Sequence, residues 1–240
     1  MRRLLPEPAG PIDPFTAYRQ VTDVWLRVGM VLSADGSVTD EEGWSAGLGG
    51  AADMEVFRTL RALADAVLVG AATVRTGRMG PARLRADLRR RRAAQGSAGP
   101  AAIVVVSRSL DLDWSLPLFT AAETPTIVVT SNTAAGTVPA GVRAIGVDDD
   151  GGLDLAAAVT RLRDDLGLAH LLCEGGPALT TSLLRAGLVD ELCLNIAPTL
   201  IGGPHHTRLL NDLGGRAELG LNAVYTADEV LFLRYLVGRV

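Results

Sequence analysis

The chain has 240 residues, with 23 basic and 27 acidic side chains and a formal net charge of −4. A mildly acidic chain of this length is expected to fold as one large domain or two small ones and to be a poor general binder of nucleic acid. No apolar stretch reaches about 18 residues, so no membrane-spanning helix is expected, and the absence of lysine excludes Schiff-base chemistry and a lysine phosphate clamp.

Residues 1–20 contain four prolines and little periodicity, which predicts an irregular lead-in before a single domain over residues 21–240. The two N-terminal arginines are not followed by an apolar segment, so no secretory signal is expected. The two cysteines, Cys173 and Cys193, lie in apolar runs and are expected to be buried thiols. These features favour a cytoplasmic protein, and neither the cysteines nor the His205-His206 pair has the spacing of a metal site.

Apolar runs and helical patterns alternate from residue 24 onward. Strands are expected over residues 24–33, 66–69, 101–106, 126–129, 141–147, 168–173 and 191–197. Helices are expected over residues 53–65, 153–166 and 177–185, and the end of the chain, residues 221–226 and 230–237, is typical of an antiparallel pair. The alternation predicts an α/β fold with a mostly parallel central sheet flanked by helices and a C-terminal antiparallel strand pair.

One low-complexity segment, residues 83–99, contains four consecutive arginines at 89–92 followed by small and polar residues. We interpret it as a solvated, mobile loop; the alternative is a basic contact for a phosphate.

Glycines and polar residues that could bind a ligand follow four of the expected strands. The carboxyl ends of parallel strands are where α/β sheets bind ligands. Glu174-Gly175-Gly176-Pro177 separates a buried strand from a helix. Two glycines there would let a diphosphate approach the backbone and the free N–H groups of the helix start, and Glu174 would face a neutral part of the ligand. A tight turn with a solvated glutamate explains the same residues equally well.

Ser107-Arg108-Ser109 follows the expected strand over residues 101–106. Hydroxyls beside a guanidinium are suited to the 2′-phosphate of NADPH. Gly70, Ala72 and Thr73 offer small residues and a hydroxyl at a third strand end, and Ser33 with Asp35 stands at a fourth. A plain turn remains the alternative for Ser107-Arg108-Ser109. Taken together, these strand ends favour a dinucleotide lying across the edge of the sheet.

Several segments resemble, in order, the reductase domain of bacterial riboflavin biosynthesis. They are GMVLSADGSVTD, LRALADAVLVGAATVRTG, VVVSRSLDLD and HLLCEGGPALTTSLLRAGLVDELCLNIAPTLIGG. The resemblance runs from about residue 24 to the C-terminus and implies a dihydrofolate-reductase-like fold. It also implies NADPH-dependent reduction of 5-amino-6-(5-phosphoribosylamino)uracil, a phosphorylated pyrimidine, and a homodimer, for which the apolar residues 191–200 and 229–237 are the candidate interface.

The resemblance implies roles for individual residues. The cofactor would contact Gly70, Ala72, Thr73, Ser107, Arg108, Gly175, Gly176, Pro177, Ala178 and Leu179. The substrate would contact Ser33, Ser45, Asp53, Arg61 and Glu174, with Arg61 neutralising the ribose phosphate. Asp35, Asp53, Glu174 or water would supply the proton, and the sequence does not choose among them.

The sequence departs from the family's pattern at two places, and two alternative functions remain open. The zinc signature of the deaminase half is missing from the sequence, and Gly77-Arg78 replaces an acidic pair of the family. Asp53 on its expected helix is also similar to the acidic residue of true dihydrofolate reductases, which keeps dihydrofolate reduction open as a main or side activity. The other alternative is a catalytically silent dinucleotide-binding regulator.

Overall fold

The chain folds around one ten-stranded mixed sheet with the strand order β1-β9-β10-β8-β2-β7-β3-β4-β5-β6. A computed structural model describes residues 1–19, 23–76, 79–148 and 151–238. The strands are β1 (Arg2–Leu5), β2 (Trp25–Ser33), β3 (Ala66–Gly70), β4 (Ala102–Val106), β5 (Ile127–Thr130), β6 (Arg143–Gly146), β7 (His170–Cys173), β8 (Glu191–Ala197), β9 (Leu219–Ala227) and β10 (Val230–Val237).

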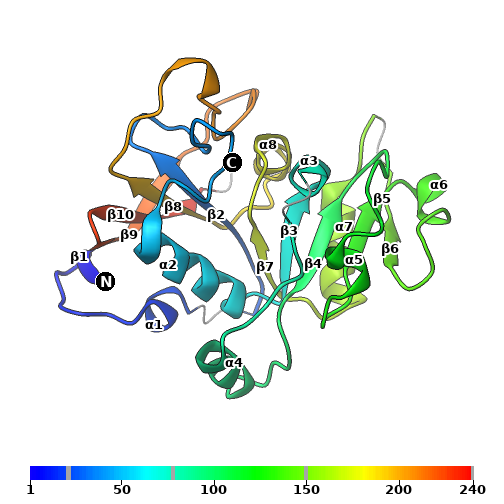
Figure 1. Cartoon of the computed structure of the whole chain (residues 1–240), viewed down its shortest axis with the longest axis horizontal. Coiled ribbons are helices and arrows are strands. Elements are labelled where there is room, and N and C mark those ends of the chain that lie inside the picture. The colour runs from blue at the N-terminus through cyan, green and yellow to red at the C-terminus, as the bar shows by residue number, and fades with distance from the viewer. Residues whose placement is uncertain (20–22, 77–78, 149–150, 239–240) are drawn as a thin grey trace.

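Helices cover both faces of the sheet (Figure 1). They are α1 (Pro14–Tyr18), α2 (Gly50–Leu63), α3 (Ala71–Arg75), α4 (Ala86–Ala93), α5 (Pro117–Thr120), α6 (Asn132–Ala135), α7 (Leu155–Asp164) and α8 (Pro177–Arg185), with a short 3-10 turn over Gly203–His205. Among the helices of the described residues, none has the length and apolar character needed to span a membrane.

The strands from β8 through β2, β7, β3, β4 and β5 to β6 run parallel, and β10 and β9 continue the sheet from β8 in antiparallel pairing. The predicted fold class, including the C-terminal antiparallel pair, is therefore confirmed. The parallel arrangement brings the carboxyl ends of β2, β7, β3 and β4 to one edge, where α3 and α8 begin (Figure 1).

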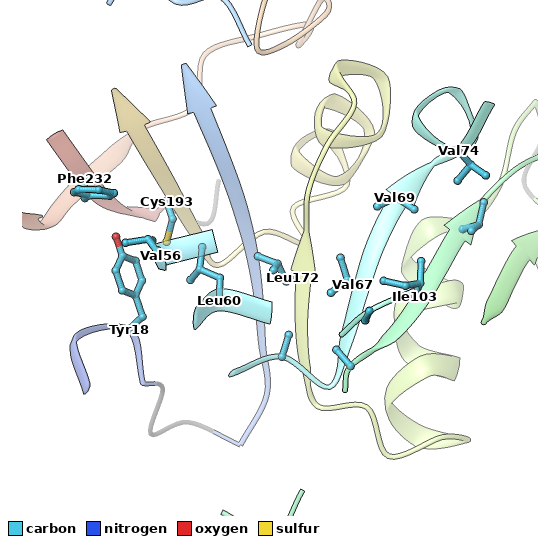
Figure 2. Packing of buried hydrophobic residues seen from close by; sticks show 14 of the residues in the cluster. Tyr18, Val56, Leu60, Val67, Val69, Val74, Ile103, Leu172, Cys193 and Phe232 are labelled. Atoms are coloured by element: carbon cyan, nitrogen blue, oxygen red, sulfur yellow. The ribbon is translucent and has the colours of Figure 1, made fainter. Parts of the chain in front are cut away.

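Alternate residues of the central strands supply two apolar cores, one on each face. Val67, Ile103 and Leu172 belong to one apolar cluster with Leu60 of α2, and Leu60 lies beside Leu172 (Figure 2). Leu68 and Val104 point to the other face, which α7 and α8 cover. Burial on both faces explains why these strands are continuous β-branched and leucine runs with no polar alternation.

The sequence predicted an irregular N-terminal lead-in. This prediction is wrong, because the lead-in contributes β1 and α1. β1 pairs with β9 at the edge of the sheet. Tyr18 of α1 is fully buried, and the carboxylate of Glu191 holds the helix in place indirectly. The Glu191 carboxylate pairs with Arg27 at 2.7 Å and with Arg234 at 2.6 Å. Arg27 in turn donates to the Tyr18 carbonyl oxygen and Arg234 to the Ala17 carbonyl oxygen.

The arginine run is also not a mobile loop, because residues 86–93 form α4. Arg92 is buried and donates to the carbonyl oxygens of Ala62 and Ala64, which satisfies acceptors at the end of α2. Arg89 forms a two-bond ion pair with Glu123 on the surface. The run therefore anchors a helix to its neighbours, which favours neither the loop nor the phosphate contact expected from the sequence.

Candidate active site

An open groove of about 780 Å³ lies over the carboxyl ends of β3, β4 and β7. The backbones of two strand ends meet there, since the Gly70 N–H donates to the Gly175 carbonyl at 3.2 Å. The groove is lined by eight of the residues that the sequence assigned to the cofactor: Gly70, Ala72, Thr73, Arg108, Gly176, Pro177, Ala178 and Leu179.

The floor of the groove depends on two glycines before α8. Gly175 has φ +88° and Gly176 has φ +24°, both in the region that favours glycine. A Cβ on Gly175 would lie 2.7 Å from the sulfur of Met30, so Gly175 must also be small to let the strand end pack. Gly176 caps α8 without a side-chain hydrogen bond, so no cap side chain occupies the N–H groups of Ala178 and Leu179, two residues that line the groove.

The predicted Ser107-Arg108-Ser109 clamp is only partly present. Arg108 lines the groove, and its Nη1 donates to the Gly151 carbonyl at 2.8 Å. Ser107 is buried and is not among the residues that line the groove. Its hydroxyl accepts the Leu110 N–H and stabilises the turn. Ser109 is exposed and accepts the Asp111 N–H in the same turn. Two of the three polar groups therefore serve the local turn.

Sequence reasoning missed other residues that line the groove, namely residues 151–156, Arg75 and Arg185. Asp154 begins α7 by accepting the Ala157 N–H. The glycine pair Gly151-Gly152 before α7 was a usable signal for residues 151–156, since a glycine pair also stands before α8.

A second cavity of about 280 Å³ lies between α2 and the sheet. It contains four of the five residues assigned to the substrate, Ser45, Asp53, Arg61 and Glu174. Thr73 lines this cavity as well as the groove, so the two spaces meet at that residue.

Arg61 and Glu174 form an ion pair inside the second cavity. Arg61 donates from Nε to Oε1 at 2.6 Å and from Nη2 to Oε2 at 2.5 Å, with side-chain exposures of 17% for the arginine and 8% for the glutamate. The guanidinium also lies 4.4 Å from the ring centre of Phe57. Burial by itself would lower the pKa of Arg61. The negative charge and hydrogen bonds of Glu174 have the larger combined effect, so the pKa of Arg61 is raised. The sequence predicted separate ligand contacts for these two residues, whereas the fold joins them.

Asp53 faces the same cavity from the first turn of α2. Burial raises the pKa of its carboxyl, although a hydrogen bond from Asn195 acts in the opposite direction. The donor is Nδ2 of Asn195 and the distance is 2.6 Å. Sequence reasoning missed Asn195, and the signal was its amide within the otherwise apolar run 192–197 of β8.

Ser33 and Asp35 line neither cavity. The Asp35 carboxylate accepts the Ser33 hydroxyl and the N–H groups of Ile201 and Gly202, and these bonds lower its pKa to about 2. The ring Nε2 of His206 also lies 3.0 Å from the Asp35 carbonyl oxygen. Asp35 thus braces the loop after β8.

The departure at Gly77-Arg78 lies outside the described residues. Within the described ranges, no group of three or more histidine, cysteine or acidic side chains has the arrangement of a metal site.

A groove over glycine-rich strand ends that meets a small cavity with acidic side chains is typical of an α/β enzyme that binds a dinucleotide beside a small polar substrate. The profile of the RibD C-terminal domain matches residues 24–233, and the chain belongs to this family.

Three known proteins illustrate the relationship. The chain is 30% identical over 224 residues to the 2,5-diamino-6-ribosylamino-4(3H)-pyrimidinone 5′-phosphate reductase of Methanothermobacter thermautotrophicus, which covers 86% of this chain and 94% of the relative. A pyrimidine reductase-like protein from Corynebacterium diphtheriae superposes with a TM-score of 0.81 at 26% identity, covering 95% of this chain and all of the other. Dihydrofolate reductase from Schistosoma mansoni, at 14% identity, a TM-score of 0.50 and coverages of 90% and 100%, shares the fold alone. The predicted family and dihydrofolate-reductase-like fold are confirmed.

Proposed function

We propose that this chain is an NADPH-dependent reductase of riboflavin biosynthesis that reduces a phosphoribosylamino-pyrimidine at C1′. The candidate substrates are 5-amino-6-(5-phosphoribosylamino)uracil and the 2-amino-pyrimidinone phosphate in the name of the archaeal relative. The observation that carries the proposal is the position of Thr73, which lines both the groove and the cavity, so that ligands in the two spaces would meet there.

The groove fits a dinucleotide. The N–H groups of Ala178 and Leu179 lie in the first turn of α8, where an anionic diphosphate is favoured. The Cβ position of Gly176 has Thr73 Oγ1 3.9 Å away, so glycine keeps open a space that a side chain would fill. When bound, the nicotinamide supplies the hydride.

The substrate cavity provides the polar groups that orient the pyrimidine and its ribose. Reduction at C1′ breaks the bond to the ring oxygen and requires a proton at that oxygen. Asp53 and Glu174 are the candidate acids that line the cavity, whereas Asp35 lies outside it and stays ionised. The Arg61–Glu174 pair fixes one wall of the cavity opposite the developing alcohol or amine.

The preference for NADPH over NADH rests on Arg108 and Arg75, two guanidinium groups that line the groove. Loss of one charge-assisted contact costs about 1.5–3 kcal/mol, so Arg108→Ala is expected to weaken NADPH binding about 10–150-fold and to affect NADH little. Arg58→Ala, an exposed change on α2 outside both cavities, is the matched control. Equal losses for both dinucleotides would contradict the clamp.

The experiment that tests the function follows NADPH oxidation with each pyrimidine phosphate and with dihydrofolate. We expect turnover of a pyrimidine phosphate at a kcat/KM well above that of dihydrofolate. A preference for dihydrofolate, or cofactor binding without turnover of any of the three, would refute the proposal.

We also propose a homodimer. Support comes from four exposed leucines on β9 and β10, namely Leu219, Leu221, Leu231 and Leu236. Sedimentation should then give a mass of two chains, and a mass of one chain at micromolar concentration would contradict this.

A further inference from the structure

The loop over residues 206–213 packs against the start of α8. Thr181 is 3% exposed, and its hydroxyl donates to the Pro177 carbonyl oxygen at 2.7 Å and accepts the Asn211 N–H at 2.9 Å. Further along α8, Arg185 donates from Nε to a carbonyl oxygen of the same loop at 3.2 Å. The first turn of α8, which lines the groove, is therefore joined to the 206–213 loop by hydrogen bonds.

The segment that follows β2 holds the other end of this loop. The buried Ser37 Oγ accepts the Thr207 N–H at 3.1 Å, and the Val38 N–H donates to the Thr207 carbonyl oxygen at 2.9 Å. Thr39 Oγ1 donates to Thr207 Oγ1, also at 2.9 Å. Since Ser37 and Arg208 also form an antiparallel bridge, the backbone of Arg208 has a fixed position.

An open cavity of about 750 Å³ lies beside the start of α8, and its lining includes Pro177, His206 and Arg208. Pro177 also lines the cofactor groove, so the cavity and the groove adjoin at the first residue of the helix. The N-terminus of a helix favours an anion, and the diphosphate of the dinucleotide is proposed to lie there. The 206–213 loop therefore stands beside the proposed position of the diphosphate.

Arg208 brings a positive charge to this cavity. It is exposed, and its guanidinium pairs with none of the residues that the structure describes. The acidic residue of the same lining, Asp212, instead pairs with Arg185, whose Nη2 lies 3.7 Å from its Oδ2. A guanidinium without a counter-charge is suited to phosphate oxygens, because its planar N–H groups can donate two parallel hydrogen bonds.

We propose that Arg208 is a further cofactor-binding residue, which contacts the diphosphate of the dinucleotide from the 206–213 loop, and that Thr181 is a positioning residue for this loop. This inference rests on the proposed function, because it takes the dinucleotide to lie in the groove. The diphosphate is common to NADPH and NADH, whereas the 2′-phosphate assigned to Arg108 belongs to NADPH alone. Arg208 therefore strengthens the binding of both dinucleotides, and Arg108 distinguishes between them.

The test measures the Kd for NADPH and for NADH by calorimetric titration, which requires no turnover. Arg208→Gln should raise both Kd values by the same factor, about fivefold to fiftyfold. The loss should shrink as KCl is raised from about 50 to about 500 mM, because salt screens an exposed contact. Arg216→Gln is the matched control and should leave both Kd values unchanged, since Arg216 is exposed, pairs with Glu218 at 2.6 Å and lines neither the groove nor the cavity.

The role of Thr181 is tested by removing and then restoring its hydroxyl. Thr181→Val keeps the shape of the side chain and should raise both Kd values at least about threefold, whereas Thr181→Ser should retain the wild-type affinity. In the double variant Arg208→Gln/Thr181→Val, the second change should add less than about twofold, because a displaced loop has no guanidinium left to lose.

Unchanged affinity in Arg208→Gln, a loss confined to NADPH, or an equal loss in the control would overturn the assignment of Arg208. Losses that multiply in the double variant would overturn the positioning role of Thr181. Failure of the proposed function is a different result, because the wild type would then bind dinucleotide without turnover, and the same titrations would still decide the role of Arg208. A wild type that binds neither dinucleotide would overturn both proposals.

Discussion

Replacing Glu174 with glutamine should show that Arg61 and Glu174 act as one unit. Removing one partner of a buried ion pair costs about 3–5 kcal/mol. The Arg61 side chain is 17% exposed, and glutamine still accepts one hydrogen bond from it. We therefore expect Glu174→Gln to lower the free energy of unfolding by about 1.5–3 kcal/mol. Arg61→Met leaves the glutamate, only 8% exposed, without its cation and should cost about 2–4 kcal/mol.

The double variant Arg61→Met/Glu174→Gln removes both charges, so its cost should fall short of the sum of the two single costs by at least about 1 kcal/mol. Urea unfolding at neutral pH measures the four free energies of unfolding, and Arg58→Met, an exposed change on the same helix, should stay within about 0.5 kcal/mol of wild type. Single costs that add within about 0.5 kcal/mol would refute the coupling.

The same variants separate two roles for Arg61 in catalysis. If the pair positions Glu174, Arg61→Met and Glu174→Gln should each lower kcat/KM, and the double variant should lose little more than the worse single one. If Arg61 instead binds the ribose phosphate, as the sequence suggested, Arg61→Met should chiefly raise KM with kcat unchanged. That result, together with unchanged stability, would show that the ion pair is not the working unit.

Three further outcomes are expected. Gly176→Val should raise the Kd for NADPH at least about tenfold and lower the Tm by several degrees, because it fills the groove floor at φ +24°; unchanged affinity would exclude this turn as the diphosphate site. Burial raises the pKa of Asp53, so its ionisation destabilises the fold and stability should fall as pH rises above the unfolded value of 3.8 through the raised folded pKa. Asp53→Asn should therefore match or exceed wild-type stability at pH 7 in urea unfolding, and an advantage that appears only in acid would reverse this reasoning. Glu191→Gln removes the buried carboxylate that Arg27 and Arg234 share and should cost about 3–5 kcal/mol, with a fall in Tm of about 6–20 °C; a loss under about 1 kcal/mol would contradict the role of the triad.

The sequence by itself determined the central architecture. The strands over Ala102–Val106 and Ile127–Thr130 were predictable because burial on both faces requires continuous apolar residues, and α8 because Pro177 and Gly187 bracket its periodic pattern. Since parallel strands end at one edge, glycine-rich strand ends such as Gly175-Gly176 also indicated where the groove would lie.

Local pattern misjudged the segments that distant residues stabilise. The lead-in lacks periodicity, yet α1 is held in place with Tyr18 buried, because Glu191 and Arg234 lie on strands far along the chain and complete an ion-pair cluster with Arg27 beside it. The run around Arg92 is polar in sequence, and it is ordered as a helix because Arg92 satisfies carbonyl groups at the end of α2. Neither partner set is visible in a short window of sequence.

The working geometry of the site was likewise decided by tertiary structure. Arg61 and Glu174 are 113 residues apart in sequence, and Asp53 and Asn195 are 142 apart. Sequence reasoning identified three of these four residues singly and gave each its own ligand contact. Only the packing of α2 over β7 and β8 joins them into one ion pair and one hydrogen-bonded pair, because charge compensation and hydrogen-bond satisfaction depend on separations in space that sequence spacing does not specify.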